Sequence, residues 1–193
     1  MLSINNLNYR KQKMKLASYK GTRPGIQGIG NILIRWRLED QISHSELIFE
    51  PGDGVDHLMP DGTCEPDEDG AYWSASSTFA EKIPSFSPKR AGKSGGVRFK
   101  RINFNKDHWK FVELDNGQGN EISQMAAIWF VKNQGVCYDM SLIVKFIVWL
   151  LPYQNNDKVM CSEAVASALG MPDPARIDPA LLHALCKRFM IKR

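Results

Sequence analysis

The chain has 193 residues, a length that allows one full domain and leaves little for a second. Lys and Arg number 25, Asp and Glu number 21, and the hydrophobic class (AVILMFWYC) makes up 43%. This composition excludes a disordered chain, a collagen-like chain and a disulfide-stapled miniprotein. We therefore expect a single domain over residues 1–193, with a real hydrophobic core.

The sequence predicts a cytoplasmic protein. Its four cysteines lie far apart without paired spacing, which is typical of reduced thiols. The N-terminus lacks the apolar core of an export signal. The most apolar run, Leu142–Leu151, contains Lys145 and is shorter than the roughly 20 residues that span a bilayer.

The predicted strands fall in the first two thirds of the chain. They cover Lys13–Lys20, Ser43–Glu50, Tyr72–Ser77, Val97–Phe104 and Trp109–Leu114, and one amphipathic helix, Ile29–Leu38, interrupts them. Residues 51–70 form an acidic loop insertion rich in Gly, Pro and Asp. In the fourth strand Val97 and Phe99 point inward, and the basic residues between them lie on a half-exposed face.

Helices predominate after the strands. Glu121–Asn133 carries Ile122, Met125, Ala126 and Trp129 on one face, and Gly135 caps its end; further helices follow at Asp139–Leu151, at Cys161–Leu169 and from Pro179 onward. Strands first and helices last, without strand–helix–strand alternation, predict an α+β domain.

Cys161 is the residue best placed for chemistry. It begins a predicted helix, where unpaired N–H groups and the helix dipole lower a thiol's pKa and can bind an oxyanion. A thiolate nucleophile needs an imidazole for proton transfer, and His44, near the start of a strand, is the candidate. The two residues would have to meet in space.

Short motifs in a fixed order link these two residues to a known family. The motifs are S-H-S-E-L at Ser43–Leu47, Tyr138-Asp139, C-S-E-A-V-A-S-A-L-G at Cys161–Gly170 and D-P-x-x-L at Asp178–Leu182. In this order the chain resembles the circularly permuted papain-like enzymes of the NlpC-type superfamily, the YiiX-like amidases and their phage relatives. The landmarks run from about Tyr19 to Leu182.

The resemblance implies a papain-like α+β fold in which the sheet with the histidine precedes the helix with the cysteine. It implies that Cys161 is the nucleophile and His44 the general base of a cysteine hydrolase. Attack on an amide or acyl ester would give a thioester that water or another acceptor resolves. The implied substrates are peptides, isopeptides, peptidoglycan stems or related acyl compounds, and no metal or organic cofactor is implied.

The residue that orients the imidazole stays open. The family usually places it on the next strand, where Ser74 and Ser76 offer only hydroxyls. Glu46 shares a strand face with His44, about 7 Å away, and a carboxylate there would raise the basicity of the imidazole. Alternatively, Glu46 pairs with an arginine and the serines bond the backbone.

Other functions also stay open. The apolar run and the basic stretch at residues 10–37 would suit a lipid-directed acyltransferase or thioesterase on the same fold, in peripheral contact with an anionic membrane. A chain that had lost its triad would be an inactive binding module. Nucleic-acid binding ranks last because the basic stretch has few aromatic residues. His57 and Cys64 lie in the acidic loop, but no second ligand pair has zinc spacing.

Overall fold

The computed structural model describes residues 14–21, 32, 41–114, 120–138 and 158–189. Five strands form an antiparallel sheet in the order β4-β3-β2-β1-β5. Their bounds are Lys15–Tyr19 (β1), His44–Ile48 (β2), Tyr72–Lys82 (β3), Ser94–Ile102 (β4) and Trp109–Glu113 (β5). All five predicted strands are confirmed, and β3 runs further than its pattern indicated.

Helices follow the sheet along the chain, as predicted for an α+β protein. They are α2 (Glu121–Asn133), α4 (Cys161–Ala168) and α5 (Pro179–Phe189), with short 3-10 turns at Asp56–Leu58 (η1) and Pro174–Arg176 (η2) and a parallel pair of two-residue strands, Cys137–Tyr138 (β6) and Lys158–Val159 (β7). The predicted helix at 139–151 lies outside the described residues, as does that at 29–38 apart from Ile32. Within the described residues, no helix has the length and apolar character needed to cross a membrane.

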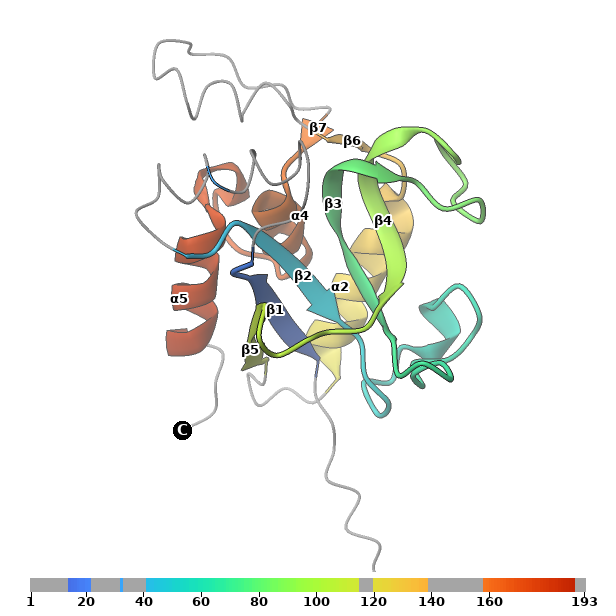
Figure 1. Ribbon diagram of the computed structural model, residues 1–193, viewed down its shortest axis with the longest axis horizontal. Coiled ribbons are helices and arrows are strands. Elements are labelled where there is room, and N and C mark those ends of the chain that lie inside the picture. Colours follow the sequence, from blue (N-terminus) through green and yellow to red (C-terminus); the bar gives the residue numbers. More distant parts are fainter. Residues whose placement is uncertain (1–13, 22–31, 33–40, 115–119, 139–157, 190–193) are drawn as a thin grey trace, which may run out of the picture.

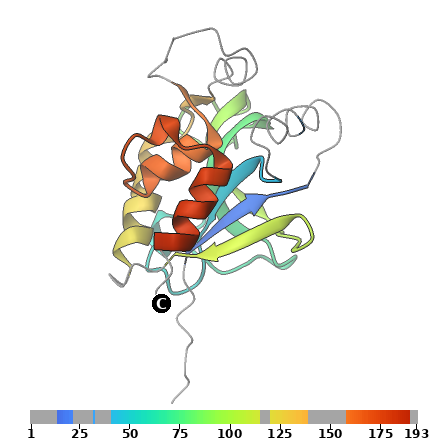
Figure 2. The same ribbon diagram turned by 90° about the vertical axis from the view of Figure 1, so that its left-hand side faces the viewer.

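The helices pack on one face of the sheet (Figures 1 and 2). Alternate strand residues, among them Leu16, Leu47 and Phe99, are buried against the helices in the main core. The other face carries a smaller cluster that includes Tyr19 and Trp109. Because strand side chains alternate between faces, His44 and Glu46 lie on the face of β2 opposite to Leu47.

The buried face of α2 differs from the prediction. Ile122 and Ala126 are buried as expected, but Met125 is 45% exposed and Phe130 is fully buried in its place. The small residue Ala127 also faces inward, which lets the helix approach its neighbours closely. The buried face of α2 therefore lies about one position further round the helix than the face that its apolar residues predicted.

The acidic loop insertion lies at the end of β2 remote from His44. It connects Ile48 to Tyr72, whereas His44 begins β2, and Figure 1 shows the loop beyond the far end of that strand. Val55, Met59 and Cys64 from this loop are buried in the main core. The loop is therefore a packed part of the domain and does not cover the end of β2 where His44 lies.

Candidate active site

Cys161 is the first residue of α4. Met160 precedes it in extended conformation, and the N–H of Met160 donates to the Glu163 carboxylate at 3.1 Å. The first intrahelical bond runs from Ala164 N–H to the Met160 carbonyl at 2.8 Å. The N–H groups of the first turn thus precede the helical hydrogen-bond ladder, and that of Ser162 acts to lower the pKa of the Cys161 thiol.

His44 begins β2 and lies beside Cys161. Each of the two side chains shifts the pKa of the other through its charge and through hydrogen bonding, so the structure brings together residues that lie far apart in the sequence. The imidazole Nε2 bonds Glu46 Oε1 at 2.9 Å, which leaves Nδ1 for the thiol. The Trp109 ring packs edge-on to the imidazole, with 6.4 Å between ring centroids.

The charges of this pair favour a thiolate and an imidazolium. Burial by itself raises the pKa of Cys161, but the His44 charge and hydrogen bond, with the backbone N–H groups of Ser45 and Ser162, bring it below its ordinary value. Burial by itself lowers the pKa of His44, but the Cys161 and Glu46 charges raise it to about 9. The two groups therefore titrate as one coupled unit.

The other buried thiols contrast with Cys161. Burial, together with nearby Asp56, raises the pKa of Cys64 to about 12. Burial alone raises the pKa of Cys186 to about 12. A reagent that attacks thiolates should therefore distinguish Cys161 from both.

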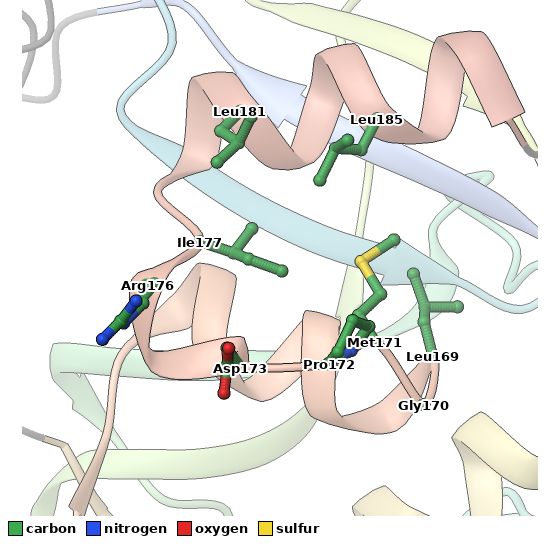
Figure 3. Close-up of a pocket in the computed structure, with 9 residues that line it drawn as sticks. All are labelled: Leu169, Gly170, Met171, Pro172, Asp173, Arg176, Ile177, Leu181 and Leu185. Carbon is green, nitrogen blue, oxygen red and sulfur yellow. The ribbon is translucent and has the colours of Figure 1, made fainter.

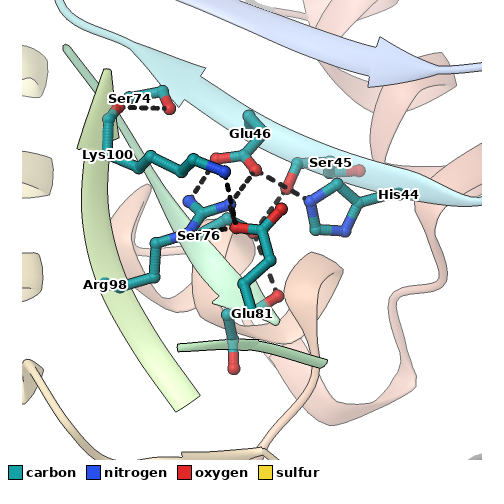
Figure 4. Close-up of polar contacts among 9 residues, drawn as sticks. His44, Ser45, Glu46, Ser74, Ser76, Glu81, Arg98 and Lys100 are labelled. Atoms are coloured by element: carbon teal, nitrogen blue, oxygen red, sulfur yellow. Dashed lines mark hydrogen bonds and ion pairs between the residues drawn. The ribbon is translucent and has the colours of Figure 1, made fainter. Parts of the chain in front are cut away.

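Glu46 is the group that holds the imidazole. It is fully buried, yet the Arg98 guanidinium keeps the pKa of this carboxyl well below its usual range, against the effect of burial. Arg98 donates to Oε2 at 2.8 Å and to Oε1 at 2.6 Å, and Oε1 also meets His44 (Figure 4). Of the sequence candidates for orienting His44, Glu46 is the one in contact with the ring.

The two serine candidates bond the backbone. Ser74 Oγ donates to the Lys100 carbonyl at 3.0 Å, and Ser76 Oγ donates to the Ser45 carbonyl at 2.6 Å (Figure 4). Both alternatives that the sequence left open therefore occur together: Glu46 pairs with an arginine and also contacts His44.

Arg98 and Glu81 are site residues that sequence reasoning missed. The alternation in β4 predicted a half-exposed basic face, but Arg98 is fully buried. The Arg98 guanidinium also bonds Glu81 Oε2, at 3.1 Å from Nε and 2.9 Å from Nη2. A signal did exist, because a carboxylate such as Glu46 on a buried strand needs a cation.

Two further features lie apart from this site. An apolar pocket of about 480 Å³ is lined by Leu169, Ile177 and Leu181 among others (Figure 3). It begins where α4 ends, whereas Cys161 lies where α4 begins. No cluster of His, Cys, Asp or Glu suited to a metal occurs among the described residues, those of the acidic loop included.

No model of a known protein family matches this chain. A search of curated proteins likewise finds no match to it. The functional argument therefore rests on the geometry of Cys161, His44, Glu46 and Arg98.

Proposed function

We propose that this protein is a cysteine hydrolase of the circularly permuted papain-like type, acting on an amide or a related acyl bond. The observation that carries the proposal is the burial of Cys161 at the start of α4 together with His44, whose Nε2 bonds Glu46 Oε1; the lowered pKa of Cys161 and the raised pKa of His44 support a thiolate–imidazolium pair. The chain order supports the permuted type, because the histidine strand β2 precedes the cysteine helix α4, with the strands β3, β4 and β5 between them.

The proposed reaction begins at the sulfur. The Cys161 thiolate attacks the carbonyl carbon, and the carbonyl electrons move onto oxygen, where the N–H groups at the start of α4 are the available donors. The His44 imidazolium gives its proton to the leaving amine as the carbon–nitrogen bond breaks, which leaves a thioester. Neutral His44 then takes a proton from water, whose oxygen displaces the sulfur and releases the acid.

Glu46 has a positioning role in this scheme. Its contact at Nε2 keeps the ring oriented with Nδ1 toward the thiol and stabilises the imidazolium, as the carboxylate does in a serine triad. Since Arg98 holds Glu46 ionised, Glu46 does not itself take the proton. This arrangement favours an enzyme over a binding module, because a module would not need a buried ion pair beside a thiolate.

The test is the rate of Cys161 alkylation by iodoacetamide at about pH 6, where an ordinary thiol of pKa about 8.5 reacts slowly. Peptide mass mapping would follow Cys161, with Cys64 and Cys186 as references in the same sample. We expect rapid labelling of Cys161 that His44→Ala abolishes, in a variant whose circular dichroism matches the native protein. Labelling of Cys161 no faster than of Cys64, or indifferent to His44→Ala, would overturn the proposal.

Turnover itself can be tested with an activated acyl probe. p-Nitrophenyl acetate should acylate Cys161 and add one acetyl group to the peptide that contains it. Cys161→Ser should remove this adduct, whereas Cys186→Ser should retain it. Hydrolysis of the adduct with release of acetate would complete the cycle.

A further inference from the structure

We propose that Arg98 is a positioning residue of the candidate active site, acting on His44 only through Glu46 and held in place by Glu81. This inference rests on the proposed function and deepens it, since it assigns the electrostatic setting of the same catalytic pair. Arg98 touches neither the thiol nor any reacting atom in this scheme.

The guanidinium group of Arg98 contacts two carboxylates. Nη1 and Nη2 meet the two oxygens of Glu46 at 2.8 and 2.6 Å, while Nε and Nη2 meet Glu81 Oε2 at 3.1 and 2.9 Å. Such two-point contacts fix the plane of the carboxylate as well as its place. Because Glu46 Oε1 also bonds His44, fixing that plane fixes the imidazole.

The sheet places these groups in one row. β2 pairs Leu47 with Ala75, so the same antiparallel register brings Ser76 beside Glu46. β4 pairs Arg98 directly with Ser76. Arg98 therefore reaches Glu46 across an intervening strand, over the short side chain of Ser76 (Figure 4). A larger residue at this position would stand in the path of the guanidinium.

The charges explain why the arginine is needed. Glu46 and Arg98 are both fully buried and Glu81 is largely buried, and Lys100, which is 47% exposed, adds a longer contact to Glu81 at 3.4 Å. Without Arg98, two carboxylates would share one buried site, and one of them would take up a proton. A protonated Glu46 would no longer support the His44 imidazolium, so the pKa of Cys161 would rise.

Stability alone does not account for this arrangement. A buried ion pair is often no more stabilising than well-packed apolar residues of the same volume, because its desolvation is costly. On the same face of the sheet, Tyr19, Ile48 and Trp109 pack together as a hydrophobic cluster. Apolar side chains can therefore fill positions of this kind. We infer that these charged groups do more than stabilise the fold, and the contact that links them to the site is that of Glu46 with His44.

The experiment is a double-mutant cycle on Cys161 alkylation by iodoacetamide at about pH 6. Arg98→Met and Glu46→Gln should each slow labelling about tenfold or more, the loss that one unit of pKa causes in the thiolate fraction. Arg98→Met/Glu46→Gln should be no slower than either single variant, because Arg98 acts through Glu46. Arg101→Met is the matched control: Arg101 also lies on β4 but pairs with Asp61, so its loss should leave the rate unchanged.

A second variant, Ser76→Val, keeps every charge and obstructs the contact. It also removes the Ser76 hydrogen bond to the Ser45 carbonyl, so Ser76→Ala, which removes that bond without adding bulk, is its control. Ser76→Val should slow labelling like Arg98→Met, because the branched side chain blocks the path to Glu46. This variant decides the matter if Arg98→Met fails to fold, as judged by circular dichroism and by protection of Cys64. Native labelling rates in Ser76→Val and Arg98→Met, or additive losses in the cycle, would overturn the role of Arg98. If His44→Ala still abolished labelling in that case, the proposed function would stand; slow labelling of the native protein would overturn both.

Discussion

Arg98 donates to both carboxylate oxygens of Glu46 from a strand that is not its neighbour, at 2.8 and 2.6 Å. The contact joins residues 52 positions apart. It turns a buried carboxyl into a fixed charge beside His44. The proposed catalytic pair therefore lies beside a charge that is held by a group wholly within the sheet, away from the Cys161 sulfur.

Replacing Cys161 with serine should lower the pKa of His44 from about 9. Burial by itself lowers this pKa, and the Cys161 charge is the largest of the influences that raise it. The chain has only four histidines, so NMR titration of the imidazole signals can follow His44 directly. Cys186→Ser should leave the titration unchanged, and an unaltered pKa in Cys161→Ser would contradict the ion pair.

The pH profile of Cys161 alkylation should have two steps. The rate should first rise with pH as the thiolate forms, below the pKa of an ordinary thiol. It should rise again near pH 9, where His44 loses its proton, because a thiolate released from its imidazolium partner is more basic and more nucleophilic. In His44→Ala the profile should collapse to one step at higher pH. A single step in the native protein would contradict the coupled pair.

Alanine substitutions in α2 should show by their loss of stability which of its side chains are buried in the core. Phe130→Ala should destabilise the protein by about 3–5 kcal/mol, because the ring is fully buried and leaves a cavity. Met125→Ala, on the same helix but 45% exposed, should cost no more than about 0.5 kcal/mol. Urea unfolding measures both. Equal losses would contradict the difference in burial between Phe130 and Met125.

Gly135 should resist substitution more strongly than Gly62. Both have positive φ, +78° and +79°, so alanine strains the backbone of each by about 1–2 kcal/mol. At Gly135 a Cβ would also clash with the Lys89 carbonyl oxygen, whereas at Gly62 nothing lies within 4 Å. We expect Gly135→Ala to lose about 1–3 kcal/mol more in urea unfolding. Matching losses would show that the close approach to Lys89 is unimportant.

Local pattern was enough to predict the elements that carry the site. The strand at His44–Ile48 and the helix that begins at Cys161 follow from residue periodicity and from turn and cap residues within a few positions. The shared face of His44 and Glu46 follows likewise, because the side-chain period of a strand is two. The helix Glu121–Asn133 has the bounds that its sequence indicated.

The tertiary structure decided everything that depends on a distant partner. Periodicity marks Arg98 as a residue of the face opposite to Phe99, but only the register of three strands shows that this face is buried and that Glu46 lies within reach. The same holds for the choice of Phe130 over Met125. The approach of Cys161 to His44 is of this kind too. The local structure of each residue follows from its neighbours in sequence, whereas the burial and the opposite charge that shift both pKa values arise only when the sheet and helices pack.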